Sequence, residues 1–285
     1  MAYKIGFTAT DDELAVDEAI IESSSNDAEY ANAKGSAQEQ DMIPRKSVVQ
    51  VLFERGNRSY SYYNDQFDLH VGDIVFVEGH MKGERGHITD VKYSFKIKLS
   101  EYKRVIAVAD TAVQGRFYLA GAHLVAFDRN ALPRKKAASW FKAPDSEEEY
   151  VSGSDDSISF ELATLDGMKI RPEIAERGRN YYFENRVRYL TVDGTHGYAI
   201  VEGGENYEVE FEYRDGMISN LSCTCYCGYN CKHEFAAMLQ LKELLSLIEK
   251  NYSEEYEKNK YFAAINKFIF FEFAINSKEK GSFTL

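Results

Sequence analysis

The sequence has no run of about 20 apolar residues, the length that a membrane-spanning helix needs. Its richest apolar stretch, residues 262–274, is shorter and contains Asn266, Lys267 and Glu272. The first residues also lack an apolar segment of signal-peptide length and soon become acidic. We therefore expect a cytoplasmic protein that is not exported and makes no membrane contact.

The motifs of several enzyme classes are missing as well. The chain has no G-x-x-x-x-G-K-[ST] phosphate-binding loop, no G-x-S-x-G nucleophile turn and no H-E-x-x-H metalloprotease helix. These absences exclude a helicase motor and remove the usual signatures of a serine hydrolase and a zinc protease. We expect a binding protein that is not an enzyme and has no small-molecule substrate.

Basic residues are scarce relative to acidic ones. The chain has 34 Lys and Arg against 46 Asp and Glu, and its net charge is −12. Because binding to phosphates needs clustered Lys and Arg, the surface as a whole is unsuited to non-specific nucleic-acid binding. Residues 1–44 hold two bases and ten acids. We interpret this segment as a flexible acidic arm, because a polar, acidic composition buries too little apolar surface to fold.

One stretch has the opposite charge. Residues 111–143 contain six bases and one acid. Near its end, three bases and an aromatic ring place charge and stacking surface together, as nucleic-acid contacts require. The candidate nucleic-acid residues are Arg134, Lys135, Lys136 and Trp140. The alternative is a solvated loop.

Short β-like runs begin after the arm. Residues 47–53, 58–63, 73–79 and 87–99 are rich in β-branched and aromatic residues and are bounded by Gly, Asn and Asp. They predict a small antiparallel domain that is barrel-like or a sandwich. The aromatic and basic residues of these runs either fill its core or contact nucleic acid; they are Tyr60, Tyr62, Tyr63, Lys92, Lys96 and Lys98.

An acidic, Ser- and Gly-rich segment at 144–159 separates this region from a second one and predicts a linker or long loop. The predicted organisation is an arm (1–44), a small β-rich domain with a basic end (45–143), the linker (144–159) and a C-terminal domain (160–285). In the last, the turn pairs at 193–194, 203–204 and 215–216 separate four strand-like runs of a β-meander.

Helical periodicity follows the meander. Residues 234–250 repeat apolar side chains at helical spacing, and we expect a second helix from 253 to about 275. Along 207–213 the residues alternate. The face that should be core holds Tyr207, Val209, Phe211 and Tyr213, and the other face, which would repel DNA, holds Glu208, Glu210 and Glu212. The predicted fold class is α+β.

All four cysteines lie within nine residues, in LSCTCYCGYNCKHEF, together with a histidine. Without a secretory signal, this clustering favours metal binding over disulfides. Three thiolates and one imidazole form a closed tetrahedral zinc site, which is structural because no position is left for water. The residues alone allow two ligand sets, in which either Cys223 or Cys227 joins Cys225, Cys231 and His233.

The motif C-x-C, a spacer and C-x-H at the start of a helix resembles the SWIM zinc finger. Here it consists of Cys223 and Cys225, a five-residue spacer, and Cys231 and His233. The upstream segments ERGRNYYFENRVRYL and ENYEVEFEYRDGMISNLSCTC resemble the lead-in and the strand pair of such domains, and the likeness covers residues 176–247. It implies these four residues as the Zn²⁺ ligands and leaves Cys227 as an additional thiol.

The resemblance also implies a function. SWIM domains occur in transposases, chromatin-remodelling helicases, recombination accessory proteins and ubiquitin-pathway proteins. The resemblance therefore implies a stand-alone, bacterial-type SWIM adaptor that binds DNA, a nucleic-acid-processing protein, or both. The alternative is a protein-only interaction subunit that uses the apolar C-terminal helix, whose side chains include Phe268, Ile269, Phe270, Phe271 and Phe273.

Overall fold

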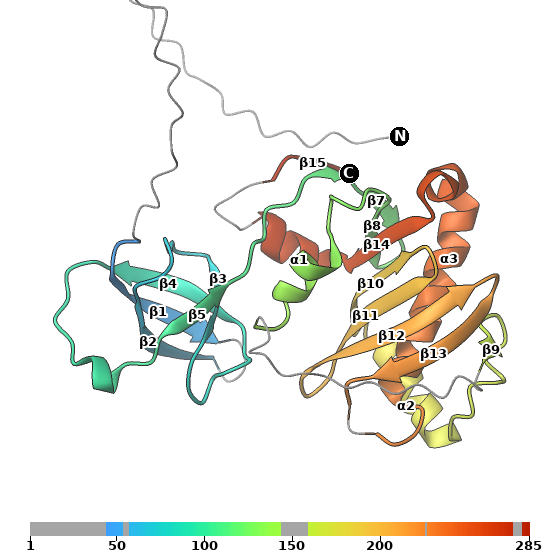
Figure 1. The fold of residues 1–285 in the computed structure, drawn as a ribbon, viewed down its shortest axis with the longest axis horizontal. Coiled ribbons are helices and arrows are strands. Elements are labelled where there is room, and N and C mark those ends of the chain that lie inside the picture. Colours follow the sequence, from blue (N-terminus) through green and yellow to red (C-terminus); the bar gives the residue numbers. More distant parts are fainter. Residues whose placement is uncertain (1–43, 54–56, 144–158, 226, 276–280) are drawn as a thin grey trace, which may run out of the picture.

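Most strands of the described residues belong to two antiparallel sheets of different size (Figure 1). The computed structural model describes residues 44–53, 57–143, 159–225, 227–275 and 281–285. The smaller sheet has five strands in the order β2-β1-β4-β3-β5. Their bounds are β1 (Ser47–Phe53), β2 (Arg58–Asn64), β3 (Ile74–Val77), β4 (Gly86–Lys92) and β5 (Val105–Val108). A short 3-10 turn, η1 (Leu99–Glu101), lies between β4 and β5.

The five-stranded sheet does not close into a barrel, although the sequence pattern predicts a barrel-like domain or a sandwich. Its edge strand β2 meets the segment before β5 at a single parallel bridge between Tyr63 and Arg104. Among the described residues, no longer ladder joins the two edges. Val49, Val51 and Phe53 lie on one face of β1 and are fully buried.

The larger sheet has eight strands in the order β7-β8-β14-β10-β11-β12-β13-β9. Its centre is the β-meander expected from the turn pairs: β10 (Val187–Asp193), β11 (His196–Glu202), β12 (Asn206–Arg214) and β13 (Met217–Cys223). The flanking strands are β7 (Tyr118–Ala120), β8 (His123–Ala126), β9 (Phe160–Glu161) and β14 (Tyr261–Asn266). The prediction of an α+β chain with mostly antiparallel sheets is confirmed.

The C-terminal region differs from the predicted pair of helices. The helix α3 (Lys232–Asn259) includes the predicted amphipathic stretch but ends where Lys260 adopts a left-handed backbone with φ 47°. The next residues form the buried strand β14, and only then follow the short helix α4 (Lys267–Phe270) and the π-helical turn η2 (Phe271–Ile275). The sequence YFAAIN is apolar on both faces because β14 lies between β8 and β10 and is covered on both sides.

The segment 109–143 was assigned to the N-terminal domain, yet it contributes β7 and β8 to the larger sheet. β8 pairs with β14, a contact between residues about 140 positions apart that no local pattern encodes. The predicted acidic arm and the linker lie almost entirely outside the described residues.

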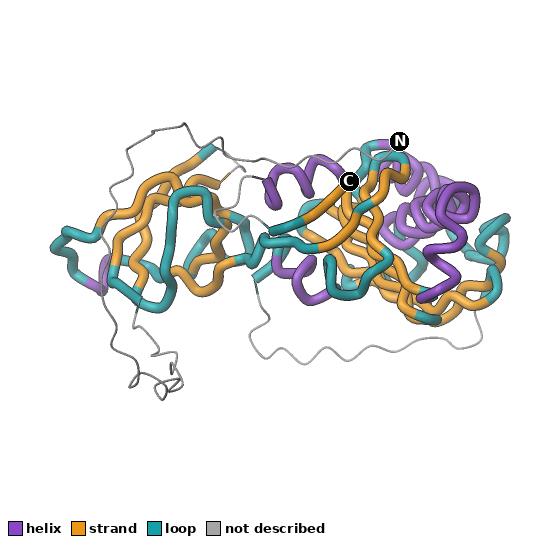
Figure 2. Tube along the Cα trace, turned by 90° about the horizontal axis from the view of Figure 1, so that it is seen from above, coloured by secondary structure: helices purple, strands orange, loops and turns teal. Residues whose placement is uncertain are grey.

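Helices cover both faces of the larger sheet (Figure 2). The helix α2 (Pro172–Phe183) and α3 pack on one face over a core that includes Val209, Phe211 and Phe235. The helix α1 (Arg134–Ser139), α4 and the small parallel pair β6 (Gly115–Arg116) and β15 (Phe283–Thr284) belong to the other side. Among the described residues, no helix combines the length and hydrophobicity that a membrane span requires.

Candidate metal centre

The candidate metal centre lies where β13 ends and α3 begins. Cys223 is the last residue of β13, and its position is fixed by pairing with Val209 of β12. The hairpin before it turns at Asp215 and Gly216, which both have positive φ. Cys231 is the N-cap of α3, and His233 lies in the first turn of that helix. Strand pairing and helix capping therefore position three of the four side chains before a metal binds.

The four predicted ligands come together. One ligand atom from each of Cys223, Cys225, Cys231 and His233 lies within 4.8 Å of the others. The Nδ1 atom of His233 is 3.7 Å from the Sγ atoms of both Cys223 and Cys231. A tetrahedral zinc ion with bonds of about 2.3 Å to sulfur and about 2.0 Å to nitrogen would separate these atoms by roughly 3.5 Å. The distances from His233 Nδ1 to these two sulfur atoms therefore suit a zinc ion held between them.

The protein environment alone disfavours charge at this site. Burial and the neighbouring Cys231 raise the pKa of the Cys225 thiol to about 12. A hydrogen bond with Cys223 and burial raise the pKa of the Cys231 thiol well above its usual range. Burial, together with Lys232, lowers the pKa of His233 to about 4. A neutral imidazole is ready to bind a metal, and a divalent cation is what allows buried thiols to ionise.

Aromatic rings hold the His233 imidazole in place. The Tyr207 ring stacks on it with a centroid distance of 4.1 Å and an interplanar angle of 17°, and Tyr181 lies 5.5 Å away on α2. The Nε2 atom of His233 is buried and has no hydrogen-bond partner among the described residues. Most metal-bound histidines donate this second N–H to a carboxylate or carbonyl. Here packing, instead of a hydrogen bond, points Nδ1 at the sulfur atoms.

Two further residues position the site, and the sequence analysis missed both. Glu234 forms a reciprocal capping box with Cys231, a pairing that the C-x-x-E spacing could have indicated. Gly178 allows α2 to approach the first turn of α3. A Cβ atom there would lie 2.9 Å from the Lys232 carbonyl oxygen and from Cβ of Phe235.

Cys227, the alternative ligand, is exposed and is not part of the cluster. The structure thus favours the ligand set that contains Cys223.

The predicted nucleic-acid residues do not form an open basic surface. Arg134 makes an ion pair with Glu210 and lies 3.8 Å from the Tyr198 ring centroid, and the Lys136 ammonium is 2.8 Å from a carboxylate oxygen of Asp110. Glu210, on the face of β12 that should repel DNA, therefore neutralises Arg134, and Asp110 neutralises Lys136. Lys135 is exposed.

Trp140 is fully buried, so its ring is not available for base stacking. Its Nε1 atom donates a hydrogen bond to the Asp110 carbonyl at 2.7 Å, and its ring meets Phe273 edge-on. The prediction of Trp140 as a stacking residue is wrong, because a single tryptophan beside apolar neighbours serves the core instead.

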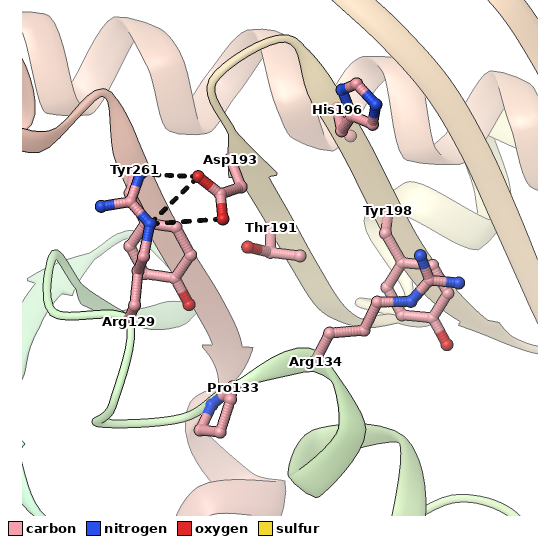
Figure 3. Close-up of a pocket in the computed structure, with 9 residues that line it drawn as sticks. Arg129, Pro133, Arg134, Thr191, Asp193, His196, Tyr198 and Tyr261 are labelled. Atoms are coloured by element: carbon pink, nitrogen blue, oxygen red, sulfur yellow. Dashed lines mark hydrogen bonds and ion pairs between the residues drawn. The ribbon is translucent and has the colours of Figure 1, made fainter.

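A pocket of about 300 Å³ lies beside this stretch. Figure 3 shows Arg129 turned towards Asp193, to which it donates hydrogen bonds, while Arg134 lies along the Tyr198 ring. Both arginines that line the pocket are thus committed to carboxylates of the same chain. Neither guanidinium of the lining is therefore without a carboxylate partner.

Comparisons with known proteins give limited support. No family model matches the chain, and no solved structure matches it significantly. The chain is similar to an uncharacterized protein of Methanocaldococcus jannaschii, with 31% identity over 97 residues. This match includes 34% of the chain and 35% of the archaeal protein, so the chain spans about a third of that relative's length.

Proposed function

We propose that this protein is a SWIM-type zinc adaptor whose metal is structural and whose function is to bind nucleic acid, alone or with a protein that processes it. The Cys₃His cluster supports this proposal most strongly. Four protein ligands complete a tetrahedron, so a bound zinc ion has no open position for water or substrate. In that arrangement the metal fastens β13 to α3 and does not act as a catalyst.

The C-x-C and C-x-H spacing links the centre to SWIM domains, and this resemblance supports the nucleic-acid part of the proposal. The structure supplies the context of the motif: a hairpin delivers Cys223 and a helix start delivers Cys231 and His233. Metal binding in such small units contributes to folding free energy, because the site does not exist in the unfolded chain.

Elemental analysis of protein purified without added metal tests the metal part, and one zinc ion per chain is expected. Anisotropy of labelled single-stranded and duplex oligonucleotides, measured between about 50 and about 200 mM salt, tests the binding part. Zinc content near zero, with full folding after chelator treatment, would contradict the metal part. Zinc-loaded protein that binds no oligonucleotide would leave the protein-only alternative.

That alternative has one supporting observation. Phe268 is 76% exposed, and Phe271 and Ile275 are also exposed at helix-like spacing after it. The apolar surface is narrower than the sequence predicts, because Phe270 and Phe273 are buried in the core. A protein partner that covers Phe268 would bind with an affinity that depends little on salt, whereas the affinity for nucleic acid would fall steeply as salt is added.

A further inference from the structure

A second basic segment lies at the outer edge of the smaller sheet. Residues 92–104, here called the basic loop, connect β4 to β5 and contain five bases and one acid. They are more densely basic than residues 111–143. Figure 1 shows the loop on the side of the five-stranded sheet that faces away from the larger sheet.

The basic loop has a defined conformation that exposes its cations. The amide of Tyr63 donates a hydrogen bond to the Lys103 carbonyl at 2.9 Å, which ties the end of the loop to β2. Phe95 packs edge-on against the Tyr63 ring with a centroid distance of 6.1 Å. Phe95 and Ile97 are half-buried, whereas Lys96 and Lys98 between and after them are exposed.

The five bases of the basic loop differ in how far carboxylates neutralise them. Arg104 makes an ion pair with Asp65, and the Lys92 ammonium lies 3.6 Å from Asp90. Lys96 and Lys103 have no carboxylate partner among the described residues. Lys98 meets Glu101 at 3.3 Å, but both side chains are largely exposed, and such a pair is worth little in water. Arg45 adds a further positive charge, because its guanidinium lies 4.3 Å from the ring centroid of Tyr93.

An open hollow of about 390 Å³ lies within the basic loop. Its walls combine two ammonium groups with an apolar side chain and an aromatic ring, and one carboxylate closes the set: Lys96, Ile97, Lys98, Glu101 and Tyr102. Cations beside apolar and aromatic surface suit a phosphate with its attached base, which is the recurring unit of a nucleic-acid strand.

We propose that the basic loop, with Arg45, is a binding surface for single-stranded nucleic acid. This inference rests on the nucleic-acid part of the proposed function and assigns it to the smaller sheet instead of to residues 134–140. The cations follow a loop beside the exposed ring of Tyr93, and the described residues offer no helix or two-stranded ribbon of this patch to enter a major groove. The chemistry therefore favours a single strand over a duplex.

The test uses the full zinc-loaded chain and a fluorescein-labelled oligothymidylate. The combined variant Lys96→Gln, Lys98→Gln and Lys103→Gln removes three cations and keeps most of each side-chain stem. Because each phosphate contact to a single strand contributes about 0.7 to the salt slope, the slope should flatten by about 2. Affinity at low salt should fall at least about tenfold. If the triple variant folds poorly, the double variant Lys96→Gln and Lys98→Gln replaces it in the test, because both of these side chains are exposed.

The matched control is the combined variant Arg134→Gln, Lys135→Gln and Lys136→Gln, which changes the net charge by the same amount. Its affinity and salt slope should stay near those of the parent. Equal losses in both variants, or a loss in the control alone, would overturn the assignment but leave nucleic-acid binding intact. A parent that binds polyglutamate or a duplex in preference to the single strand would also overturn it.

The result also separates this inference from the proposed function. If the parent holds one zinc ion but binds no oligonucleotide, the nucleic-acid part of the proposed function fails and the surface assignment fails with it. If the parent binds the single strand and the loop variant binds it equally well, only the surface assignment fails. Zinc content, measured on each variant, shows that the metal centre is unaffected in either case.

Discussion

Cys231 and Glu234 hold each other at the start of α3. The Glu234 amide donates a hydrogen bond to Sγ of Cys231 at 3.4 Å, and the Cys231 amide donates one to the Glu234 carboxylate at 2.7 Å. The same sulfur atom faces His233 and belongs to the metal cluster. The N-cap of the longest helix among the described residues therefore also belongs to the candidate metal cluster, so helix capping and metal binding would support each other.

Replacing Glu234 should reveal this coupling. Glu234→Ala removes the acceptor for the Cys231 amide and should cost about 1 kcal/mol of stability and about tenfold in zinc affinity. Glu234→Gln keeps an acceptor oxygen and should retain most of both. Urea unfolding of zinc-saturated protein and competition with a chromophoric chelator measure the two effects. Equal damage from Gln and Ala would show that the charge of Glu234, and not the capping box, is what matters.

Gly178 should resist substitution although it lies in a helix. Helix propensity alone favours Ala over Gly by about 1 kcal/mol. A Cβ atom at this position, however, would press on the backbone carbonyl of Lys232 next to the metal ligands. Gly178→Ala should therefore destabilise the protein and weaken zinc binding. Asn180→Ala is the control, because Asn180 is exposed on the same helix, and it should be neutral or slightly stabilising.

The candidate metal centre could be predicted from the sequence because its residues are close together in the chain. Cys223, Cys225, Cys231 and His233 fall within eleven consecutive residues, and the strand and helix that flank them carry clear periodicity. The meander was readable for the same reason, since Gly and Asp pairs mark its turns. Each of these features depends on neighbours in the chain.

The parts of the fold and site that could not be predicted depend on contacts between residues far apart in the sequence. β14 follows a helix directly and is apolar on both faces, so its residues carry neither the period of a half-buried strand nor a turn signal. Its partner β8 comes from a segment that the charge pattern assigned to another domain. Likewise, the basic side chain of Arg134 gave no sign that Glu210 would neutralise it from β12, because tertiary pairing decides that.

Stability should fall in mild acid because of His123. This residue of β8 is fully buried, and its Nε2 atom lies 2.8 Å from the Val187 carbonyl oxygen, while Nδ1 has no partner among the described residues. Burial lowers its pKa from 6.5 to about 4. As pH falls below about 6.5, His123 becomes protonated in the unfolded chain but stays neutral in the folded chain, so the unfolding free energy decreases.

The expected loss attributable to His123 is about 1 kcal/mol between about pH 7 and about pH 5.5. His123→Gln keeps a donor for the Val187 carbonyl and removes the titrating group, so its stability should depend less on pH by that amount. Urea unfolding in excess zinc at both pH values measures the difference, because all other titrating groups are shared. Parallel pH profiles of parent and variant would contradict the assignment.

Cys223 and Cys227 are the alternatives for one ligand position, and replacing each provides the sharpest test of the metal centre. Cys223 ends a paired strand and lies 3.7 Å from His233 Nδ1, whereas Cys227 is exposed outside the cluster. Zinc in small modules contributes on the order of 10 kcal/mol that is also folding free energy. Cys223→Ser should therefore lose zinc or melt well below the parent, and Cys227→Ser should change stability by no more than about 1 kcal/mol. Zinc content and thermal melts of both variants decide the matter. If Cys227→Ser loses the metal and Cys223→Ser keeps it, the ligand set contains Cys227, and the loop after β13 must rearrange to bring that thiol to the metal.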